Sequence, residues 1–447
     1  MASTDETSEC QVAVLVPHPS KVALLVTDSD SKQLPMVTVS AEPEAPEVTR
    51  RVAELLGTPV TLLRANAMEW YDNFDAASMV IEVEPLTSSP PEPLRWRDLE
   101  GPGAPHLGPD WAAGSVIAWL HERREGWSDL RPQWSRPGWM SRASRWMCEQ
   151  MELAGYEDPR PPQIRQVWGL SIVLAADSAS GTAYLKVSGQ RFLAEATVTQ
   201  ALSRHSPGAL PDVIAVDRER GWLLMSDING PILGDQPPST WGPALDALHD
   251  LQRQWLDQTD ELLALGAESR PLTDLAAWVT DSTSDDALMS RLSPSEQAAW
   301  QIEAPTMINA CSRLAEIGPG VSLVHGDFHP WNAASAATGT CIFDWTDASV
   351  GHPFVDLVTF VTRTKDRALR KSMIGRYLAL WQAELPGAEH EEVARLSMLV
   401  GSLYQAQTYS HLIATLMPDD LGALRDADIG WMRGAQRLVS GDILAEN

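Results

Sequence analysis

The stretch that decides the fold is "LVHGDFHPWN", residues 323–332, which joins a His-Gly-Asp triplet to an Asn across a short Pro/Trp interval. Twelve residues after that Asn, the segment "CIFDWTD" at 341–347 places another Asp inside an apolar run. The segments "SLVH" and "CIFDW" are apolar and rich in residues that favour strands. We therefore expect two short strands that hold the polar residues of this region in place.

An Asp, an Asn and an Asp at this spacing fit the chemistry of phosphoryl transfer from ATP. That reaction needs a carboxylate that orients or deprotonates the attacking hydroxyl, and oxygen ligands that hold Mg²⁺ against the phosphates. Asp327 would be the base, while Asn332 and Asp344 would supply amide and carboxylate oxygens for Mg²⁺. An isolated His-Gly-Asp triplet is typical of an ordinary turn, so the prediction depends on the complete spacing.

The other polar and aromatic residues of this region have simpler interpretations. We expect His325 to be structural and to bond to the backbone near the loop, and His329 and Trp331 to pack the loop. Asp356 lies in "PFVDLVTFV" (353–361), an apolar run typical of a helix. A buried Asp in that position is expected to brace the catalytic loop rather than to react.

The motif resembles the signature of the aminoglycoside phosphotransferase family, a branch of the protein-kinase-like fold. The match runs through "HGDFHPWN" and "IFDWTDASVGHPFVDL", and the resemblance extends over roughly residues 137–440. It implies an α+β, bilobal phosphotransferase with a β-rich N-lobe at 137–228 and a helical C-lobe with the catalytic loop at 229–447. It also implies ATP and Mg²⁺ as cofactors, with Asp327 as the catalytic residue.

The resemblance further implies a phosphate-binding lysine and its partner upstream. Lys186 in "GTAYLKVSG" lies on a predicted strand, and Glu195 in "RFLAEATVTQAL" lies on the helix that follows. They would form the ion pair that anchors the phosphates. A strand Lys and a helix Glu are common surface charges, and it is their order before the catalytic loop that favours this role.

Two further segments would contact the nucleotide. The segment "GWLLMSDINGPIL" (221–233) resembles the hinge of the family, which would place Met225 and Asp227 beside the adenine. The turn "VWGLSIV" (167–173) stands where protein kinases have a glycine-rich loop, and Ser171 is its candidate phosphate contact. That turn has no GxGxxG pattern, a departure that the family often shows.

The N-terminal 100 residues weakly resemble a Nudix domain. The Nudix box laid on "MVTVSAEPEAPEVTRRVAELLGT" (36–58) puts five residues in register, namely Glu42, Arg50, Val52, Glu54 and Gly57. Arg51 and Leu55 replace two of its clustered glutamates, so we expect a degenerate Nudix-like α/β domain at 1–100 without hydrolase activity. A generic small α/β domain is an equally supported interpretation. In either case it would cap the kinase, shape its acceptor site or mediate dimerisation.

The Pro/Gly-rich stretch at 86–110 marks the end of that domain, and residues 101–136 would be a linker with a helix. Within the domain, "QVAVLVP" and "KVALLVTD" flank the short "HPS" and predict a hairpin. The segment "EVTRRVAELLG" predicts a helix that ends at Gly57.

Composition limits the classes of partner. The chain has 447 residues, 44% of them hydrophobic, and a net charge of −26. Such negative charge argues against nucleic acid and anionic membranes as partners, and it could attract a cationic ligand. Four scattered cysteines, no apolar run of membrane-spanning length and no signal peptide predict a reduced, cytoplasmic protein.

The leading functional prediction is an O-phosphotransferase that acts on a hydroxyl of a small molecule. The acceptor would be an aminoglycoside, an amino sugar, another antibiotic or a metabolite, and a homodimer is left open. One alternative keeps the chemistry and makes the acceptor a Ser or Thr of a peptide or protein. Another is a non-catalytic nucleotide-binding scaffold, which the complete set of polar residues argues against.

Overall fold

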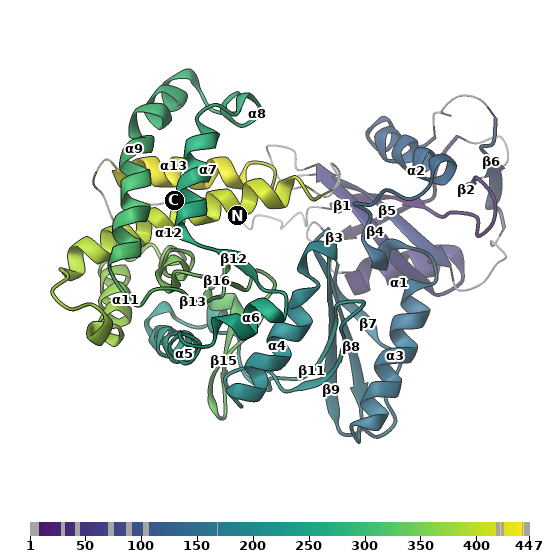
Figure 1. The fold of residues 1–447 in the computed structure, drawn as a ribbon. Coiled ribbons are helices and arrows are strands. Elements are labelled where there is room, and N and C mark those ends of the chain that lie inside the picture. Colours follow the sequence, from purple (N-terminus) through teal and green to yellow (C-terminus); the bar gives the residue numbers. More distant parts are fainter. Residues whose placement is uncertain are drawn as a thin grey trace, which may run out of the picture. The chain divides into compact units, whose positions relative to one another are not determined.

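The computed structural model describes residues 9–27, 32–40, 45–69, 76–85, 92–101, 107–167, 169–416, 421, 424–439 and 441. The chain forms two compact units, Met1–Gly189 with Thr415–Gly422, and Gln190–Ala414 with Ala423–Asn447 (Figure 1). The predicted α+β class is confirmed, because strands dominate the N-terminal part and helices the C-terminal part. The predicted domain boundaries after residues 100, 136 and 228 stay predictions.

The first unit begins with a four-stranded sheet in the order β3-β1-β5-β4. Its strands are β1 (Glu9–Leu15), β3 (Met36–Ser40), β4 (Val60–Glu69) and β5 (Ala76–Pro85). Strand β1 runs parallel to β5 and antiparallel to β3, and β4 runs antiparallel to β5. A separate two-stranded ladder joins β2 (Ala23–Val26) to β6 (Arg95–Asp98).

The predicted hairpin between β1 and β2 forms only at its tip. The main chain pairs there through His18 N to Ala23 O at 2.9 Å and Leu25 N to Val16 O at 3.1 Å. Beyond this turn the two strands enter different sheets, because β1 is an inner strand with β3 and β5 on its two sides. The turn was predictable from local sequence, and the long-range partners of β1 were not.

Helices cover both faces of this sheet. Helix α1 (Ala45–Leu56) buries Val48, Val52 and Leu56, and it ends as predicted at Gly57, whose φ of +63° is the left-handed conformation of a helix C-terminus. Helix α2 (Ala113–Glu125) packs on the opposite face, in a cluster that joins Val116 and Trp119 to the alternating residues Ala13 and Leu15. The Nudix resemblance stays a prediction, and Glu42 lies outside the described residues.

A buried charge network ties α2 to the sheet. Arg131 donates to Glu82 of β5 at 2.5 Å and to Glu122 of α2 at 2.6 Å. All three side chains are buried. A 3-10 turn at Asp110–Ala112 precedes α2, and another at Gln133–Ser135 follows it.

The first unit continues through helix α3 (Trp139–Leu153) into three antiparallel strands. These strands are β7 (Gln163–Val167), β8 (Ser171–Ser178) and β9 (Gly181–Ser188). Strand β8 pairs with both β7 and β9, in a register that sets Val173 opposite Lys186.

The second unit is mostly helical. It opens with helix α4 (Ala194–His205) and the antiparallel pair β10 (Val213–Asp217) and β11 (Trp222–Ser226). The described part of this unit continues with the helices α5 (Gly242–Gln254), α6 (Thr259–Ala264), α7 (Leu272–Ser282), α8 (Asp286–Met289), α9 (Pro294–Glu316), α10 (Leu357–Val361), α11 (Arg367–Leu380), α12 (His390–Ile413) and α13 (Ala427–Val439). The 3-10 turns are Gln190–Phe192, Leu233–Asp235, Pro238–Thr240, Pro330–Asn332, Pro353–Asp356 and Gln382–Glu384.

Two small ladders of the second unit frame the motif. Strands β12 (Glu268–Arg270), β16 (Ser349–Gly351) and β13 (Ser322–Val324) form one, with β16 in the middle. Strands β14 (Ala333–Ala336) and β15 (Gly339–Ile342) form the other, as an antiparallel hairpin. The expected strand at "SLVH" forms as β13, whereas the expected strand at "CIFDW" forms only at its start, because β15 ends at Ile342.

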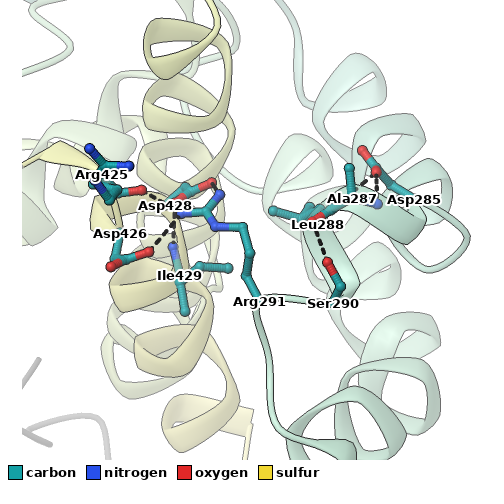
Figure 2. A network of polar contacts seen from close by, with 9 residues as sticks. All are labelled: Asp285, Ala287, Leu288, Ser290, Arg291, Arg425, Asp426, Asp428 and Ile429. Atoms are coloured by element: carbon teal, nitrogen blue, oxygen red, sulfur yellow. Dashed lines mark hydrogen bonds and ion pairs between the residues drawn. The ribbon is translucent and has the colours of Figure 1, made fainter. Parts of the chain in front are cut away.

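Helix α12 lies at the centre of the helical core and is buried on all sides from Val393 to Thr408 except at Arg395. Its neighbour α13 is attached to the corner between α8 and α9 by Arg291 (Figure 2). Arg291 donates to both carboxylate oxygens of Asp428 at 2.7 Å and to Asp426 at 3.1 Å. Among the described residues, no helix is both long and apolar enough to cross a membrane.

Candidate active site

The candidate catalytic loop begins where β13 ends. Strand β13 pairs antiparallel with β16, in a register that sets Leu323 opposite Val350, and His325 and Gly326 follow directly. Gly326 has φ of +87°, and a Cβ placed on it would lie 2.5 Å from the carbonyl oxygen of Asp347. Only glycine fits this turn position, which directly precedes Asp327.

Asp356 fixes the backbone of that turn, as the sequence predicted. Its carboxylate accepts the main-chain N–H groups of His325 and Gly326, both at 2.8 Å, and the side chain of Gln252 at 3.0 Å. Asp356 is fully buried, and this burial raises its pKa to about 7 against the effect of the N–H donors. The loop is therefore held by main-chain hydrogen bonds to one carboxylate.

His325 is structural, also as predicted. It is fully buried, its Nε2 lies 3.0 Å from the carbonyl oxygen of Phe343, and its Nδ1 accepts from the N–H of Asp327 at 3.4 Å. Burial lowers the pKa of His325 to about 4. A neutral ring with its proton on Nε2 satisfies both contacts and links the loop to the segment that carries Asp344.

Asp327 has the environment of an ionised carboxylate with access to solvent. Its side chain is 33% exposed, and its Oδ2 lies 3.5 Å from Nε2 of His329. Burial acts to raise the pKa of Asp327, but the neighbouring His329 and the other groups around it act in the opposite direction, and the pKa lies below its ordinary value. His329, expected only to pack the loop, thus also lies next to the carboxylate; its position two residues after the Asp was the available signal.

Asn332 and Asp344 follow within the same region. The side-chain N–H of Asn332 donates to the carbonyl oxygen of Asp327 at 3.0 Å, which turns the amide oxygen to the opposite side. Asp344 has φ of +64°, a conformation that non-glycine residues seldom adopt, and it accepts from the hydroxyl of Thr346 at 2.6 Å. Such backbone strain persists where the surroundings enforce it, often at functional sites.

These two side chains offer the hard oxygen donors that Mg²⁺ prefers. Within the described residues no group of three or more His, Cys, Asp or Glu side chains forms a metal site. One amide and one carboxylate make an incomplete shell, which suits an ion that takes its remaining ligands from phosphates and water. The donor set therefore fits magnesium bound together with a nucleotide.

Asp347 is a further carboxylate that the sequence reading did not single out. Burial raises its pKa to about 7, and the negative charges of Asp327 and Asp344 act in the same direction. Its backbone and Cβ lie against Gly326. The available signal was a second Asp three residues after Asp344.

Helix α12 borders the loop on another side. Gln405 donates to the carbonyl oxygen of Gly326 at 2.6 Å. Arg270 of β12 donates to Gln407 and Thr408 at 2.9 and 2.8 Å. Burial raises the pKa of Tyr409 on the same helix, and so does the charge of Asp327, which sets this ring within electrostatic range of the candidate base.

The predicted nucleotide contacts are divided between the two units. Lys186 on β9 and Ser171 on β8 belong to the first unit, and each is 7% exposed. Glu195 lies in the first turn of α4 in the second unit and is 5% exposed. Their roles, and the ion pair between Lys186 and Glu195, stay predictions.

The predicted hinge residues lie at the end of β11. Met225 pairs with Val213 across the β10–β11 ladder. The carboxylate of Asp227 accepts the N–H of Asn229 at 3.1 Å, and its carbonyl oxygen accepts the side-chain amide of Asn229 at 3.0 Å. Asp227 thus shapes a turn in which Asn229 has φ of +54°. Contacts of Met225 and Asp227 with adenine stay predictions.

Comparison with known proteins matches residues 173–394 to the phosphotransferase enzyme family. These residues run from β8 to α12 and include the whole candidate catalytic loop. No curated protein sequence matches the chain.

Solved structures that are similar to this chain include the following three proteins. A choline kinase from Streptococcus pneumoniae is 13% identical, with a TM-score of 0.48, over 68% of this chain and 100% of that one. A choline/ethanolamine kinase family protein from Mesorhizobium loti is 16% identical, with a TM-score of 0.46, over 67% and 94%. The aminoglycoside phosphotransferase APH(4)-Ia is 16% identical, with a TM-score of 0.44, over 67% and 99%.

Proposed function

Since the chain belongs, through residues 173–394, to the phosphotransferase enzyme family, we propose that it phosphorylates a hydroxyl of a small molecule with Mg-ATP and with Asp327 as catalytic base. The single observation that carries this proposal is that Asp327 is accessible to solvent and lies on a fixed loop. Its carboxylate is partly exposed, its pKa is lowered, and the main chain that leads into it is fixed by Asp356. A carboxylate that is ionised, accessible and held in place suits a general base.

In the proposed reaction Asp327 accepts the proton of the acceptor hydroxyl while that oxygen attacks the γ-phosphorus. The bond from the γ-phosphorus to the β,γ-bridging oxygen breaks, ADP leaves, and the new phosphate ester forms. The nearby His329 favours the ionised form of Asp327, which is the form that can accept this proton. The loop of Asp327 stays in place during the step because its N–H donors and Asp356 are buried.

Asn332 and Asp344 would hold the magnesium ion, through the amide oxygen and the carboxylate. When bound, the ion neutralises charge on the phosphates. Lys186, oriented by Glu195, would anchor the phosphates, with Ser171 as a further contact. Met225 and Asp227 would border the adenine, where backbone groups make the hydrogen bonds.

The acceptor would be an aminoglycoside, an amino sugar, another antibiotic or a metabolite. The negative charge of Asp327 in the loop favours acceptors that carry an amine beside the reacting hydroxyl. This preference is an electrostatic argument, and an acceptor panel tests it directly.

The test is ADP release from Mg-ATP in the presence of aminoglycosides, amino sugars, nucleosides, macrolides and Ser/Thr peptides. Asp327→Ala, assayed in parallel, supplies the blank. A small-molecule acceptor that raises ADP release above this blank supports the proposal and names the substrate class. A rate that is the same for Asp327→Ala and the wild type contradicts the role of Asp327, and turnover of peptides alone contradicts the acceptor class.

A further inference from the structure

Trp331 is exposed although it belongs to a buried loop. It is 44% exposed, whereas its neighbours Phe328, Pro330 and Asn332 are buried. No other aromatic residue in the described part of the chain reaches this exposure. A large aromatic surface between a candidate base and a candidate magnesium ligand needs a reason, because exposed apolar area is unfavourable.

The ring of Trp331 is held in one place. It lies over Gly234, where an added Cβ would come within 2.4–2.6 Å of three of its ring atoms. It meets the buried Trp241 edge to face, with ring centroids 6.3 Å apart, and His329 at 6.1 Å. One face of the indole is therefore covered, and the exposed remainder cannot turn away without losing these contacts.

The segment under the ring continues from the predicted adenine-binding strand. Gly234 lies in the turn Leu233–Asp235, which follows β11 and Asp227 along the chain. The residues between Asp227 and Gly234 lie along β14. There the N–H of Ser335 donates to the carbonyl oxygen of Pro231 at 3.0 Å, and Ile232 forms a β-bridge with Ala334. Trp331 thus joins the segment after the hinge to the loop that carries Asn332.

We propose that Trp331 is an aromatic platform for the nucleoside part of the bound nucleotide, and that residue 234 is glycine because the ring needs that space. This inference rests on the proposed function, which puts adenine beside Met225 and magnesium at Asn332. Aromatic rings stack on nucleosides through dispersion and desolvation, and a ring that is already immobile loses little entropy on binding.

The acceptor side is the competing location for the ring. Helix α12 contacts the loop at Gly326, through Gln405, whereas Trp331 lies against the turn after β11. The placement of the ring against Gly234 therefore favours the nucleotide over the acceptor.

The test is calorimetric titration of the full-length protein with Mg-ADP and with Mg-tripolyphosphate, which lacks a nucleoside. Trp331→Ala is expected to weaken Mg-ADP binding about 10-fold or more and to leave Mg-tripolyphosphate binding within about 2-fold. Trp331→Phe keeps a ring and should lose less. Ile302→Ala removes an apolar side chain that is 78% exposed on α9, and serves as the matched control.

Gly234→Ala tests the position of the ring without altering Trp331. It is expected to weaken Mg-ADP binding by displacing the indole, and to have no further effect in the Trp331→Ala background, where the space is free. This non-additivity also separates a specific role from a general loss of folding.

Three results would overturn the inference. Equal Mg-ADP affinity for Trp331→Ala and the wild type removes the platform and leaves the proposed function intact. Equal loss for Mg-ADP and Mg-tripolyphosphate shows that the ring acts on the loop and not on the nucleoside. A wild-type protein that binds no Mg-ADP refutes both the inference and the proposed function.

Discussion

Two buried aspartates of the second unit accept hydrogen bonds in a similar way but are expected to have different roles. Asp356 and Asp428 are 0% and 1% exposed, and each accepts hydrogen bonds on both carboxylate oxygens. The donors to Asp356 are the main-chain N–H groups of His325 and Gly326 at 2.8 Å and the side-chain amide of Gln252 at 3.0 Å. The donors to Asp428 are the two terminal nitrogens of Arg291, both at 2.7 Å, and the N–H of the adjacent Ile429 at 2.9 Å (Figure 2).

The difference lies in what each donor fixes. Arg291 brings a full positive charge, so its pair with Asp428 neutralises itself and attaches α13 to the corner between α8 and α9. Main-chain N–H groups bring dipoles, so Asp356 fixes the path of the backbone that enters Asp327. We therefore expect the Asp428 contact to support the fold and the Asp356 contact to support turnover.

The largest expected effect is that of Asp356→Ala. It leaves two buried N–H groups unsatisfied and frees the turn, so turnover should fall about 100-fold and the free energy of unfolding by about 2–5 kcal/mol. The measurements are ADP release and urea denaturation. Asp428→Ala is the matched control, with a similar loss of stability and turnover within about 3-fold of wild type in the folded fraction. Equal losses of turnover in the two variants would contradict the separate roles of Asp356 in turnover and Asp428 in folding.

The dependence of stability on pH tests the region around Asp356, because His352 is the N-cap of the turn Pro353–Asp356. Its Nδ1 accepts the N–H of Phe354 at 3.3 Å, and burial lowers its pKa to about 4. The unfolded chain takes up the proton near pH 6.5 and the folded chain only near pH 4, so this contribution to stability is lost as pH falls through that window. The loss should reach about 3 kcal/mol.

His352→Gln removes this titration and keeps an acceptor. Urea denaturation of both proteins at several pH values between 6.5 and 4 should show a shallower fall of stability for the variant. Parallel curves for variant and wild type would mean that His352 is charged in the folded chain, against the structure.

A smaller effect is expected for Arg291→Gln. Asp428 then loses a charged partner, but Arg291 is 31% exposed and water can replace part of the contact. The free energy of unfolding should fall by about 2 kcal/mol, while ADP release by the folded protein stays at the wild-type rate. A loss of turnover without a loss of stability would show that this contact belongs to the functional part of the unit.

The smallest effect concerns the start of α9, next to Arg291. Ser293 and Glu296 form a capping box, in which the N–H of Glu296 donates to the Ser293 hydroxyl and the N–H of Ser293 donates to the Glu296 carboxylate at 2.8 Å. Ser293→Ala should lower the free energy of unfolding by about 1 kcal/mol. Thermal denaturation measures it, and an unchanged midpoint would show that the helix start is held by other contacts.

The same two regions show how far the sequence could predict the molecule. The roles of Asp356 and His325 followed from position, because an Asp in an apolar helix-like run and a His before a strained turn have few alternatives. The helix predicted from Glu47 onward, and its end at Gly57, followed from periodicity and a C-terminal glycine, and the observed helix begins two residues earlier, at Ala45.

Contacts between distant segments could not be predicted. Strand β12 has three residues and no alternation, yet it pairs parallel with β16. The Arg291–Asp428 pair joins residues 137 positions apart, with no motif to signal it. The positions of Asp347 and His329 beside the catalytic loop could not be predicted. A single extra Asp or His near a motif gives no signal in the sequence, and only the folded turn at Gly326 places these residues near Asp327.

The measurement that tests the account most directly is the rate of ADP release by Asp327→Asn, made together with Mg-ADP affinity. The acceptor would be the one that the wild type uses fastest, or water if it uses none. The expected rate is about 100- to 10,000-fold below that of the wild type, with Mg-ADP affinity within about 3-fold, because only the proton acceptor is lost. A rate equal to that of the wild type would contradict Asp327 as the catalytic base and with it the function assigned to the loop.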